Sequence, residues 1–364
     1  MRILFLTLVT SSEKSGIYYY INKLINSISV LKKDSDYTIY VLTNKDFEHE
    51  FENISTIKLI KINLPHYPRW IMRPLFFVWL NTILRLEIKK HNIDVIHFPN
   101  PVPILFRYKQ KLVVTIHDIA EFQNARFRNL HRLFRRFVTN TSIRNADSLI
   151  TVSEFSKEEI VKTLKYSSSK IVVTPLASRF SIDKQNKINT SKKYILHLGG
   201  MHLNKNVPRL LEAFSKIKQE TSLYLVGNTI GLKEINKAYS TIENIKIIGF
   251  LDDKELKELI KGASIFIYPS LYEGFGLPIL EAMALGVPVI TSNRTSMPEV
   301  AGDAALYVNP ENVEEIAEAI SRLLQDDALR ASLIEKGYKR VQEFSWEKTA
   351  ALTIQAYKQT LSND

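Results

Sequence analysis

The sequence predicts an α/β protein made of two doubly wound domains, each built on a parallel sheet. Three observations predict this class. Short apolar segments alternate with amphipathic ones along the chain, which is typical of strands and helices in parallel sheets. The alternation stops at a polar segment, Pro175–Lys192, and restarts after it. The 364 residues are enough for two domains, each with its own core.

The first domain is expected to span residues 1–176. Amphipathic periodicity predicts helices there that include Ile17–Val30 and Ser153–Leu164. The predicted strands are Arg2–Thr7, Tyr37–Leu42, Val95–His97, Leu112–Thr115, Ser148–Val152 and Ile171–Val173.

The second domain is expected at residues 193–349, after a linker at 177–192. Its predicted strands are Tyr194–Leu198, Ser222–Val226, Ile245–Ile248, Ser264–Tyr268, Val287–Thr291 and Ala305–Val308. The last predicted helices are Val313–Leu324, Asp327–Glu343 and Trp346–Leu361.

Composition narrows the functional classes. With no cysteine, the chain has neither disulfides nor thiolate metal sites. No apolar run is long enough to span a bilayer, and Ile3–Val9 fits a buried first strand better than a signal core. Residues 1–178 hold 26 Lys+Arg and 15 Asp+Glu, and residues 179–364 hold 23 of each, so the excess of +11 lies in the first half. Such a field attracts anionic partners such as a membrane face or a lipid pyrophosphate. No nucleic-acid motif accompanies it.

The most informative segment is Glu-Gly-Phe-Gly-Leu-Pro-Ile-Leu-Glu, residues 273–281. It follows an apolar strand and opens a short helix, with Pro278 in the first turn, where its missing N–H costs nothing. Gly274 and Gly276 leave the backbone bare, so its N–H groups can approach an anion. Glu273 and Glu281 flank this phosphate cradle, which suits a pyrophosphate between two hydroxyl-rich groups, as in a sugar nucleotide.

Residues 268–290, Tyr-Pro-Ser-Leu-Tyr-Glu-Gly-Phe-Gly-Leu-Pro-Ile-Leu-Glu-Ala-Met-Ala-Leu-Gly-Val-Pro-Val-Ile, resemble the donor-site signature of glycosyltransferase family 4. The resemblance implies a retaining enzyme with the GT-B fold, whose two Rossmann-like domains enclose a cleft. It implies a donor on the second domain, an acceptor on the first, and a terminal helix, 350–364, that returns to the first domain.

The resemblance also implies roles on the donor side. Glu281 would bind ribose hydroxyls and Glu273 the donor sugar, near the reacting centre. The leaving diphosphate would be stabilised by backbone N–H groups instead of a metal ion. These N–H groups belong to Gly274, Phe275, Gly276 and Leu277.

Residues 194–214 resemble the loop that opens the family's second domain. Lys205 matches the position that contacts the pyrophosphate, and neighbouring Asn204 is placed on the donor side with it. Many members carry an Arg near Gly200, which this chain lacks. In the turn after Ile245–Ile248, the family contacts the base mostly by backbone. That turn contains Gly249, Phe250 and Leu251.

The first domain adds residues at strand ends. Val113-Val-Thr-Ile-His-Asp resembles the strand end of the mannosyltransferase-like branch, so His117 would face the reactive sugar carbon and Asp118 would orient the loop or the acceptor. Gly16 remains of the family's glycine-rich loop, on the donor side. Tyr18 and Tyr19 either line the acceptor site or pack a helix. We assign His117, Glu273 and Lys205 to catalysis.

The segment Ala125–Phe137 is basic and aromatic. On a helix, Phe127, Leu130, Phe134 and Phe137 share one face. Four arginines flank it and are expected to face a membrane, unless the helix is a core helix with a charged rim. They are Arg128, Arg132, Arg135 and Arg136.

Asp34-Ser35-Asp36 satisfies the acidic pattern of metal-dependent glycosyltransferases, but it reads as a solvated turn. We therefore expect no metal cofactor.

The sequence thus predicts a retaining glycosyltransferase that moves a hexose from a nucleotide sugar, with GDP-mannose favoured. The acceptor is expected to be a polysaccharide or lipid-linked glycan, as in O-antigen, capsule or exopolysaccharide synthesis, at the inner face of the cell membrane. The alternative is a non-catalytic partner subunit of another transferase. A nicotinamide dehydrogenase is disfavoured because no Gly-x-Gly-x-x-Gly follows a strand with an acid at the expected distance. A sugar-nucleotide epimerase has no sequence support.

Overall fold

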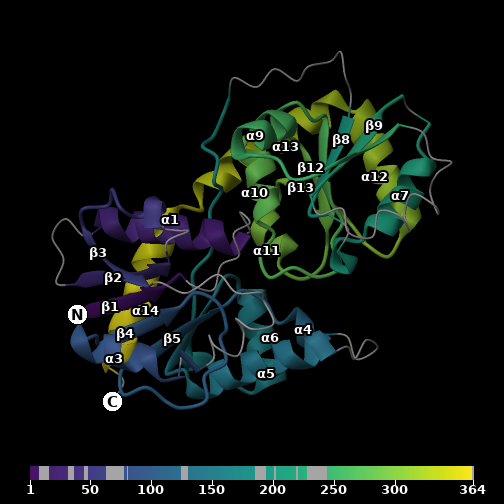
Figure 1. Ribbon diagram of the computed structural model, residues 1–364. Helices are drawn as coiled ribbons and strands as arrows, with labels where there is room; N and C mark the ends of the chain where they lie inside the picture. The colour runs from purple at the N-terminus through teal and green to yellow at the C-terminus, as the bar shows by residue number, and fades with distance from the viewer. Residues whose placement is uncertain are drawn as a thin grey trace. The chain divides into compact units, whose positions relative to one another are not determined.

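The computed structural model describes residues 1–7, 16–31, 37–44, 48–62, 78–79, 81–123, 130–184, 194–200, 202–218, 220–227 and 244–362. The chain divides into two compact units. One combines Met1–Leu176 with Trp346–Asp364, and the other is Ala177–Ser345. Figure 1 shows the helices and strands of each unit.

The first unit is built on a seven-stranded parallel sheet with the order β3-β2-β1-β4-β5-β6-β7. Its strands are β1 (Arg2–Leu6), β2 (Thr38–Asn44), β3 (Ile57–Ile62), β4 (Val95–Phe98), β5 (Lys111–Ile116), β6 (Ser148–Thr151) and β7 (Ile171–Val173). Its helices are α1 (Gly16–Leu31), α3 (Ile83–Lys90), α4 (Ala120–Gln123), α5 (Leu130–Asn145), α6 (Glu154–Leu164), α14 (Trp346–Ser362) and the 3₁₀ turns η2 (Glu48–Glu50) and η3 (Ser168–Lys170).

The second unit contains a six-stranded parallel sheet with the order β10-β9-β8-β11-β12-β13. Its strands are β8 (Tyr194–Leu198), β9 (Ser222–Val226), β10 (Ile245–Ile248), β11 (Ile265–Tyr268), β12 (Val289–Ser292) and β13 (Ala305–Val308). Its helices are η4 (Leu203–Lys205), α7 (Val207–Ser215), α9 (Asp253–Lys261), α10 (Leu277–Ala284), α11 (Met297–Ala301), α12 (Val313–Gln325) and α13 (Asp327–Gln342). In Figure 1, α7 and α12 lie on one side of this sheet and α9, α10 and α13 on the other.

In both sheets the strand order reverses beside the first strand, so β1 pairs with β4 in one unit and β8 with β11 in the other. The central strands are buried on both faces, as in β4, β5, β8 and β11. This confirms the predicted class of two doubly wound parallel sheets. In such sheets, ligands bind at the carboxyl ends of the strands where the order reverses.

The first unit ends at Leu176, where the sequence placed the end of the first domain, but the second unit begins at Ala177 without a separate linker. The described part of the expected linker, 177–184, packs inside the second unit: Asp183 N–H donates to the carbonyl of Ala284, and Tyr338 Oη donates to the carbonyl of Asp183. The returning segment begins at Trp346 rather than at 350. Its helix α14 packs beside α1 and the first sheet (Figure 1). Among the described residues, no helix combines the length and hydrophobicity needed to cross a bilayer.

Candidate active site

The predicted lysine and glutamate meet at the reversal point of the second sheet. Lys205, after β8, donates from Nζ to Glu273 Oε1 at 2.7 Å and to Tyr268 Oη at 2.5 Å, at the end of β11. Burial opposes the charge on Lys205, but Glu273 and Tyr268 more than offset it, so the pKa of Lys205 is raised. Burial, and next Glu273, raise the pKa of Tyr268. At neutral pH the cluster therefore holds an ammonium ion beside a neutral phenol.

The lysine lies across a glycine. A Cβ on Gly199, whose φ is +127°, would come within 2.8 Å of Lys205 Cε. A Cβ on Gly227 would come within 2.7 Å of the backbone N of Gly200. Glycines at these positions therefore allow the loop after β8 to place the lysine stem against the backbone.

The loop that carries Glu273 is fixed from two sides. Asn204 accepts from Leu271 N–H at 2.8 Å through its carbonyl and donates from Nδ2 to the carbonyl of Tyr272 at 3.1 Å. Ser296 Oγ donates to the carbonyls of Glu273 and Phe275, at 3.0 and 2.9 Å. Asn204 thus shapes the loop, and its predicted donor contact would be additional to this role. The Ser296 contribution was not predicted, because backbone carbonyls leave no trace in a sequence.

The predicted phosphate cradle has the expected backbone form. Gly276 has φ +97° and forms the N-cap of α10 with no side-chain cap, and Pro278 stands in the first turn. Gly274, Phe275 and Gly276 are buried, while Leu277 is half-buried. Phe275 packs edge-on against Phe344, with ring centroids 5.9 Å apart, so its side chain fixes the loop and only its backbone can serve a ligand.

Glu281 is fully buried, and an arginine that the sequence reasoning missed binds both of its oxygens. Arg179 Nε lies 2.6 Å from Oε1, and Nη2 lies 3.1 Å from Oε2. Arg179 Nη1 also reaches Asp253 Oδ1 at 3.1 Å. A buried carboxylate on the apolar helix 277–284 requires a cationic partner from another part of the chain. That requirement is the sequence feature that could have indicated a partner such as Arg179.

Arg179 also links Glu281 to the predicted base-binding turn. Gly249, Phe250 and Leu251 lie between β10 and α9, and the Phe250 side chain is 69% exposed. Asp253 is the first residue of α9. Arg179 therefore joins Glu281 to Asp253, two residues after Leu251.

In the first unit, His117 follows β5 directly. Its Nε2 lies 3.0 Å from the carbonyl of Pro99, which can only accept, so Nε2 carries the proton and Nδ1 is the acceptor. The ring packs edge-to-face against Tyr20 at 4.7 Å between centroids. Burial lowers the pKa of His117, although Pro99 and Asp118 oppose the shift, so the ring is neutral at pH 7. Asp118 Oδ1 accepts from Ala120 N–H at 2.9 Å, at the start of α4.

Of the predicted glycine-rich loop, the structure describes Gly16 and the residues after it. Gly16 begins α1, is exposed, and has nothing within 4 Å of an added Cβ. Tyr18 Oη donates to Glu50 Oε1, and the rings of Tyr18 and Tyr19 meet edge-to-face at 5.4 Å. Both tyrosines are half-buried. This favours the alternative that they pack α1, although contact with an acceptor stays a prediction.

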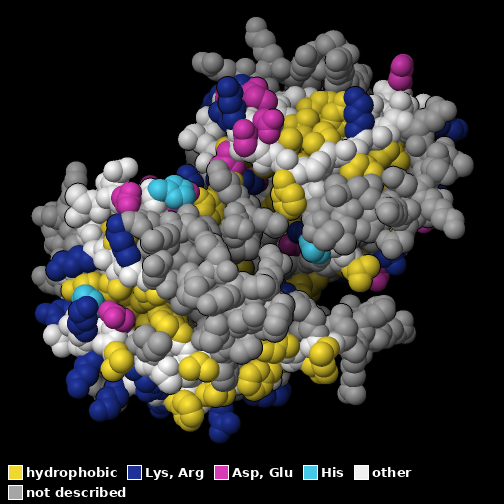
Figure 2. Space-filling view, in the orientation of Figure 1, with side chains coloured by type: hydrophobic (Ala, Val, Ile, Leu, Met, Phe, Trp, Pro, Cys, Tyr) yellow, Lys and Arg dark blue, Asp and Glu magenta, His cyan; other side chains and the backbone are white. Residues whose placement is uncertain are grey.

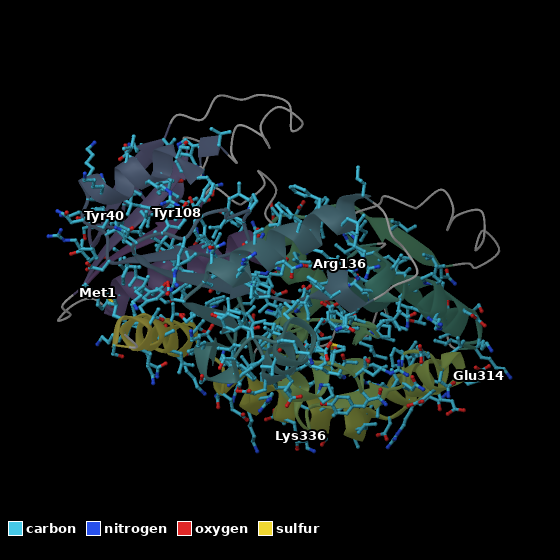
Figure 3. All side chains as sticks on the ribbon, turned by 90° about the horizontal axis from the view of Figure 1, so that it is seen from below. Met1, Tyr40, Tyr108, Arg136, Glu314 and Lys336 are labelled. Atoms are coloured by element: carbon cyan, nitrogen blue, oxygen red, sulfur yellow. The ribbon has the colours of Figure 1, made fainter. Side chains whose placement is uncertain are left out.

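Two of the predicted membrane-facing arginines are directed toward α4 instead. Arg132 Nε and Arg136 Nε each donate to the carbonyl of Glu121 at 2.7 Å (Arg136 is labelled in Figure 3). The reason is that the last carbonyls of the short helix α4 lack helical partners, and guanidinium donors satisfy them. Arg135 pairs with Glu121 Oε2 at 3.3 Å but stays 56% exposed. Arg128 lies outside the described residues.

The predicted apolar side chains of the membrane-facing helix are exposed on α5, unlike two of its arginines. The exposed fractions of Leu130, Leu133, Phe134 and Phe137 are 85, 48, 45 and 45%. Figure 2 shows hydrophobic side chains beside lysines and arginines on the surface around α5.

No group of three or more His, Cys, Asp or Glu side chains that could hold a metal ion occurs within the described ranges. Asp34 and Asp36 lie outside them.

Comparisons with known proteins agree with this geometry. Residues 31–177 match the family pattern described as Glycosyltransferase Family 4, and residues 178–340 match that of Glycosyl transferases group 1. The chain is 34% identical over 268 residues to O-antigen chain mannosyltransferase B of Escherichia coli, covering 68% of this chain and 70% of that protein. It is 29% identical over 330 residues to O-antigen chain mannosyltransferase RfbU of Salmonella typhimurium, covering 85% and 90%. The structure of Anabaena Alr3699/HepE in complex with UDP-glucose aligns over all of both chains with a TM-score of 0.71 at 17% identity, which shows a shared fold.

Proposed function

Because the chain belongs to glycosyltransferase family 4 and has the GT-B fold, we propose that it transfers mannose from GDP-mannose to a glycan acceptor, either a polysaccharide or a lipid-linked glycan, as in O-antigen synthesis. The observation that carries the proposal is the Lys205–Glu273 pair at the reversal point of the second sheet. Two relatives named as O-antigen chain mannosyltransferases support the sugar and the acceptor class.

Lys205 is suited to the diphosphate. Its ammonium has three N–H donors, of which Tyr268 and Glu273 use two, so the third can point at a phosphate oxygen. Bare backbone at the start of α10 adds N–H groups and the positive end of the helix dipole. Charge that develops on the leaving diphosphate is thereby stabilised by groups already in place.

Transfer with retention uses the same face of the sugar for departure and attack. The bond from the anomeric carbon to the phosphate oxygen breaks, and an acceptor hydroxyl oxygen bonds to that carbon. The hydroxyl proton passes to the leaving phosphate. Glu273 binds hydroxyls of the transferred sugar beside the reacting centre. His117 is neutral, with Nδ1 as its acceptor nitrogen. As the family resemblance implies, Nδ1 would accept a hydrogen bond from a donor hydroxyl. Asp118, Tyr18 and Tyr19 lie on the acceptor side of this scheme.

The proposed ribose site consists of the pair Glu281 and Arg179 rather than of the Glu281 carboxylate alone. Glu281 is fully buried under Arg179, so ribose hydroxyls reach it only when Arg179 or its neighbours shift. The carboxylate has about four lone-pair sites, and the two Arg179 contacts leave others for hydroxyls. Gly249, Phe250 and Leu251 would contact the base beside this pair.

We place the enzyme at the inner, anionic face of the cell membrane. The excess charge of +11 in residues 1–178 and the exposed apolar side chains of α5 support that location. A lipid-linked acceptor would be presented there.

The donor is tested by thermal stabilisation of the purified protein with GDP-mannose, UDP-glucose and UDP-galactose. A ligand at a hundredfold excess over its dissociation constant adds about 2.7 kcal/mol of apparent stability. Lys205→Gln should abolish most of the shift, because the buried cation is lost. Stabilisation by a uridine sugar alone would contradict GDP-mannose, and stabilisation by none would contradict the donor site.

Metal independence is tested in the same preparation. With the diphosphate charge carried by Lys205 and α10, mannosyl transfer should persist in EDTA. Loss of activity that manganese or magnesium restores would direct attention to Asp34 and Asp36.

The alternative is a non-catalytic partner subunit, favoured by the loop before α1, where Gly16 alone remains of the family's paired glycines. Slow hydrolysis of GDP-mannose by the purified chain distinguishes the two. A partner subunit would not release GDP at any enzyme concentration.

A further inference from the structure

A chain of polar side chains crosses the apolar core of the first unit. Tyr357 of α14, His97 of β4, Thr115 of β5 and Tyr20 of α1 are each at most 1% exposed. His97 Nδ1 lies 2.5 Å from Tyr357 Oη, and its Nε2 lies 2.7 Å from Thr115 Oγ1. Tyr20 Oη lies 3.0 Å from the same threonine oxygen.

These groups form one directed network. Burial lowers the pKa of His97 to about 3, so its imidazole is neutral and has one donor and one acceptor nitrogen. If Nδ1 carries the proton, it donates to Tyr357, Thr115 donates to Nε2, and Tyr20 donates to Thr115. If Nε2 carries the proton, it donates to Thr115 and Tyr357 donates to Nδ1, while the bond between Thr115 and Tyr20 can run either way. Phe5 closes one side of the imidazole, with ring centroids 4.5 Å apart. Buried polar groups are costly unless they are fully paired, so such a network fixes its members tightly.

The network ends at the supports of His117. Tyr20 packs its ring against the His117 ring. Thr115 stands two residues before His117 on β5, and Pro99, whose carbonyl accepts from His117 Nε2, stands two residues after His97. The two strands are paired in register, with His97 opposite Val113. The network thus touches the His117 ring directly through Tyr20, and it joins the two strands that lead to Pro99 and to His117.

We propose that Tyr357, His97, Thr115 and Tyr20 form a positioning network that fixes the orientation of the His117 ring, and so keeps its Nε2–H directed at the Pro99 carbonyl. Helix α14, the last element of the chain, therefore supplies a residue to the site of the first unit. The inference rests on the proposed function for its effect on activity, but not for its effect on the His117 ring.

Position, rather than bulk, is what these hydroxyls provide. Phenylalanine would fill the volume of Tyr357 or Tyr20, and valine that of Thr115, without the desolvation of polar groups. An apolar core would keep the ring of residue 20 beside His117, but it would remove the hydrogen bonds that fix that ring in place.

Tyr357→Phe tests the proposal, because it removes one oxygen and leaves the ring. The turnover number should fall about tenfold, less than the ~10²-fold that a 1 Å misplacement of a reacting group can cause. The KM for the donor should change less than the turnover number, because Lys205 and Glu273, which are proposed to hold the diphosphate and the sugar, are not altered. Tyr166→Phe is the matched control, since Tyr166 Oη donates to the Ala146 carbonyl in the same unit at 3.2 Å. It should keep wild-type kinetics.

The ring itself is followed by ¹⁵N NMR of histidine-labelled protein, with His117→Gln used for assignment. The wild type should show His117 protonated at Nε2, and Tyr357→Phe should show a mixture of tautomers. Thr115→Val breaks two links of the network and is the second variant, should Tyr357→Phe fold poorly. Unchanged ¹⁵N shifts in a folded variant overturn the proposal. If His117→Gln retains full activity while the shifts respond as expected, the catalytic role of His117 fails and the network stands.

Discussion

At the residue scale, the pairing of Arg179 with Glu281 has a large energetic consequence in the second unit. Glu281 has no exposed surface, and both oxygens meet one guanidinium. A buried pair adds little net stability compared with apolar residues, but removing one partner leaves a bare charge. The pair therefore makes the donor side intolerant of single substitutions.

Arg179→Met should lower the free energy of unfolding of the second unit by about 3–5 kcal/mol, because the Glu281 charge stays buried without its close cation. Adding Glu281→Leu should recover most of that loss but not nucleotide binding. Urea unfolding and titration calorimetry measure the two effects. Arg294→Met is the matched control, since its pair with Glu311 is half-exposed and should cost at most about 1 kcal/mol. A loss for Arg179→Met as small as the control's would contradict the argument.

The family resemblance placed Lys205 and Glu273 on the donor side, but the sequence did not predict that the two side chains pair. It could not predict Arg179, because that residue stands in a polar segment with no periodicity. Nor could it predict that Asn204 and Ser296 bind backbone carbonyls of the Glu273 loop. Those contacts depend on a turn geometry that no side-chain pattern encodes.

At the element scale, α5 shows how far a helical pattern can be interpreted. The spacing of Leu130, Phe134 and Phe137 predicted one apolar face, and these residues are exposed. The neighbouring Arg132 and Arg136 were misassigned because their partners, the end carbonyls of α4, belong to another element. Strand β3 was not predicted for a related reason: Ile57–Ile62 is an edge strand interrupted by Lys58 and Lys61, so its apolar residues do not form a continuous run.

Phe134→Ser with Phe137→Ser should weaken binding to vesicles that contain anionic lipid, roughly thirtyfold, because about 1 kcal/mol per partly exposed ring is lost. Lipid co-sedimentation at low and high salt measures this. Leu86→Ser with Leu105→Ser is the control, since both residues are exposed apolar positions of the first unit outside α5. Equal binding by both double variants, or salt-insensitive binding, would argue against insertion through α5. Substituting Arg132 and Arg136 would not test membrane binding alone, because it would also remove their hydrogen bonds to the carbonyls of α4.

At the scale of the whole molecule, each unit buries one neutral histidine in its sheet. His97 lies in the first, and in the second His197 Nδ1 donates to the carbonyl of Ile267 at 3.0 Å. Burial lowers the pKa of His97 to about 3 and that of His197 to about 4. In the unfolded chain both titrate near 6.5.

Acid should therefore weaken both units. Below pH 6.5 the two histidines bind protons in the unfolded chain but stay neutral in the folded chain. Their contribution to the free energy of unfolding is therefore fully present above pH 6.5, and it is lost as the pH falls toward the folded pKa values. Between pH 7 and pH 5 the free energy of unfolding should drop by about 2 kcal/mol per histidine. Urea unfolding at several pH values measures the slope, which His97→Gln and His197→Gln should each reduce. His49→Gln, at a 70% exposed position, should leave it unchanged. Identical slopes in all variants would show that carboxylates dominate the acid response.

The return of α14 to the first unit has a consequence for synthesis of the protein. Residues 177–345 leave the ribosome before the helix that carries Tyr357, so the second unit can fold while the first still lacks its last element. The usual order, in which the domain nearest the N-terminus folds first, is thereby reversed. Until α14 has been synthesised, a nascent chain exposes the apolar surface of α1 and the sheet that α14 will cover. That surface is a natural binding site for chaperones, and any premature stop codon before Trp346 would leave it open for good.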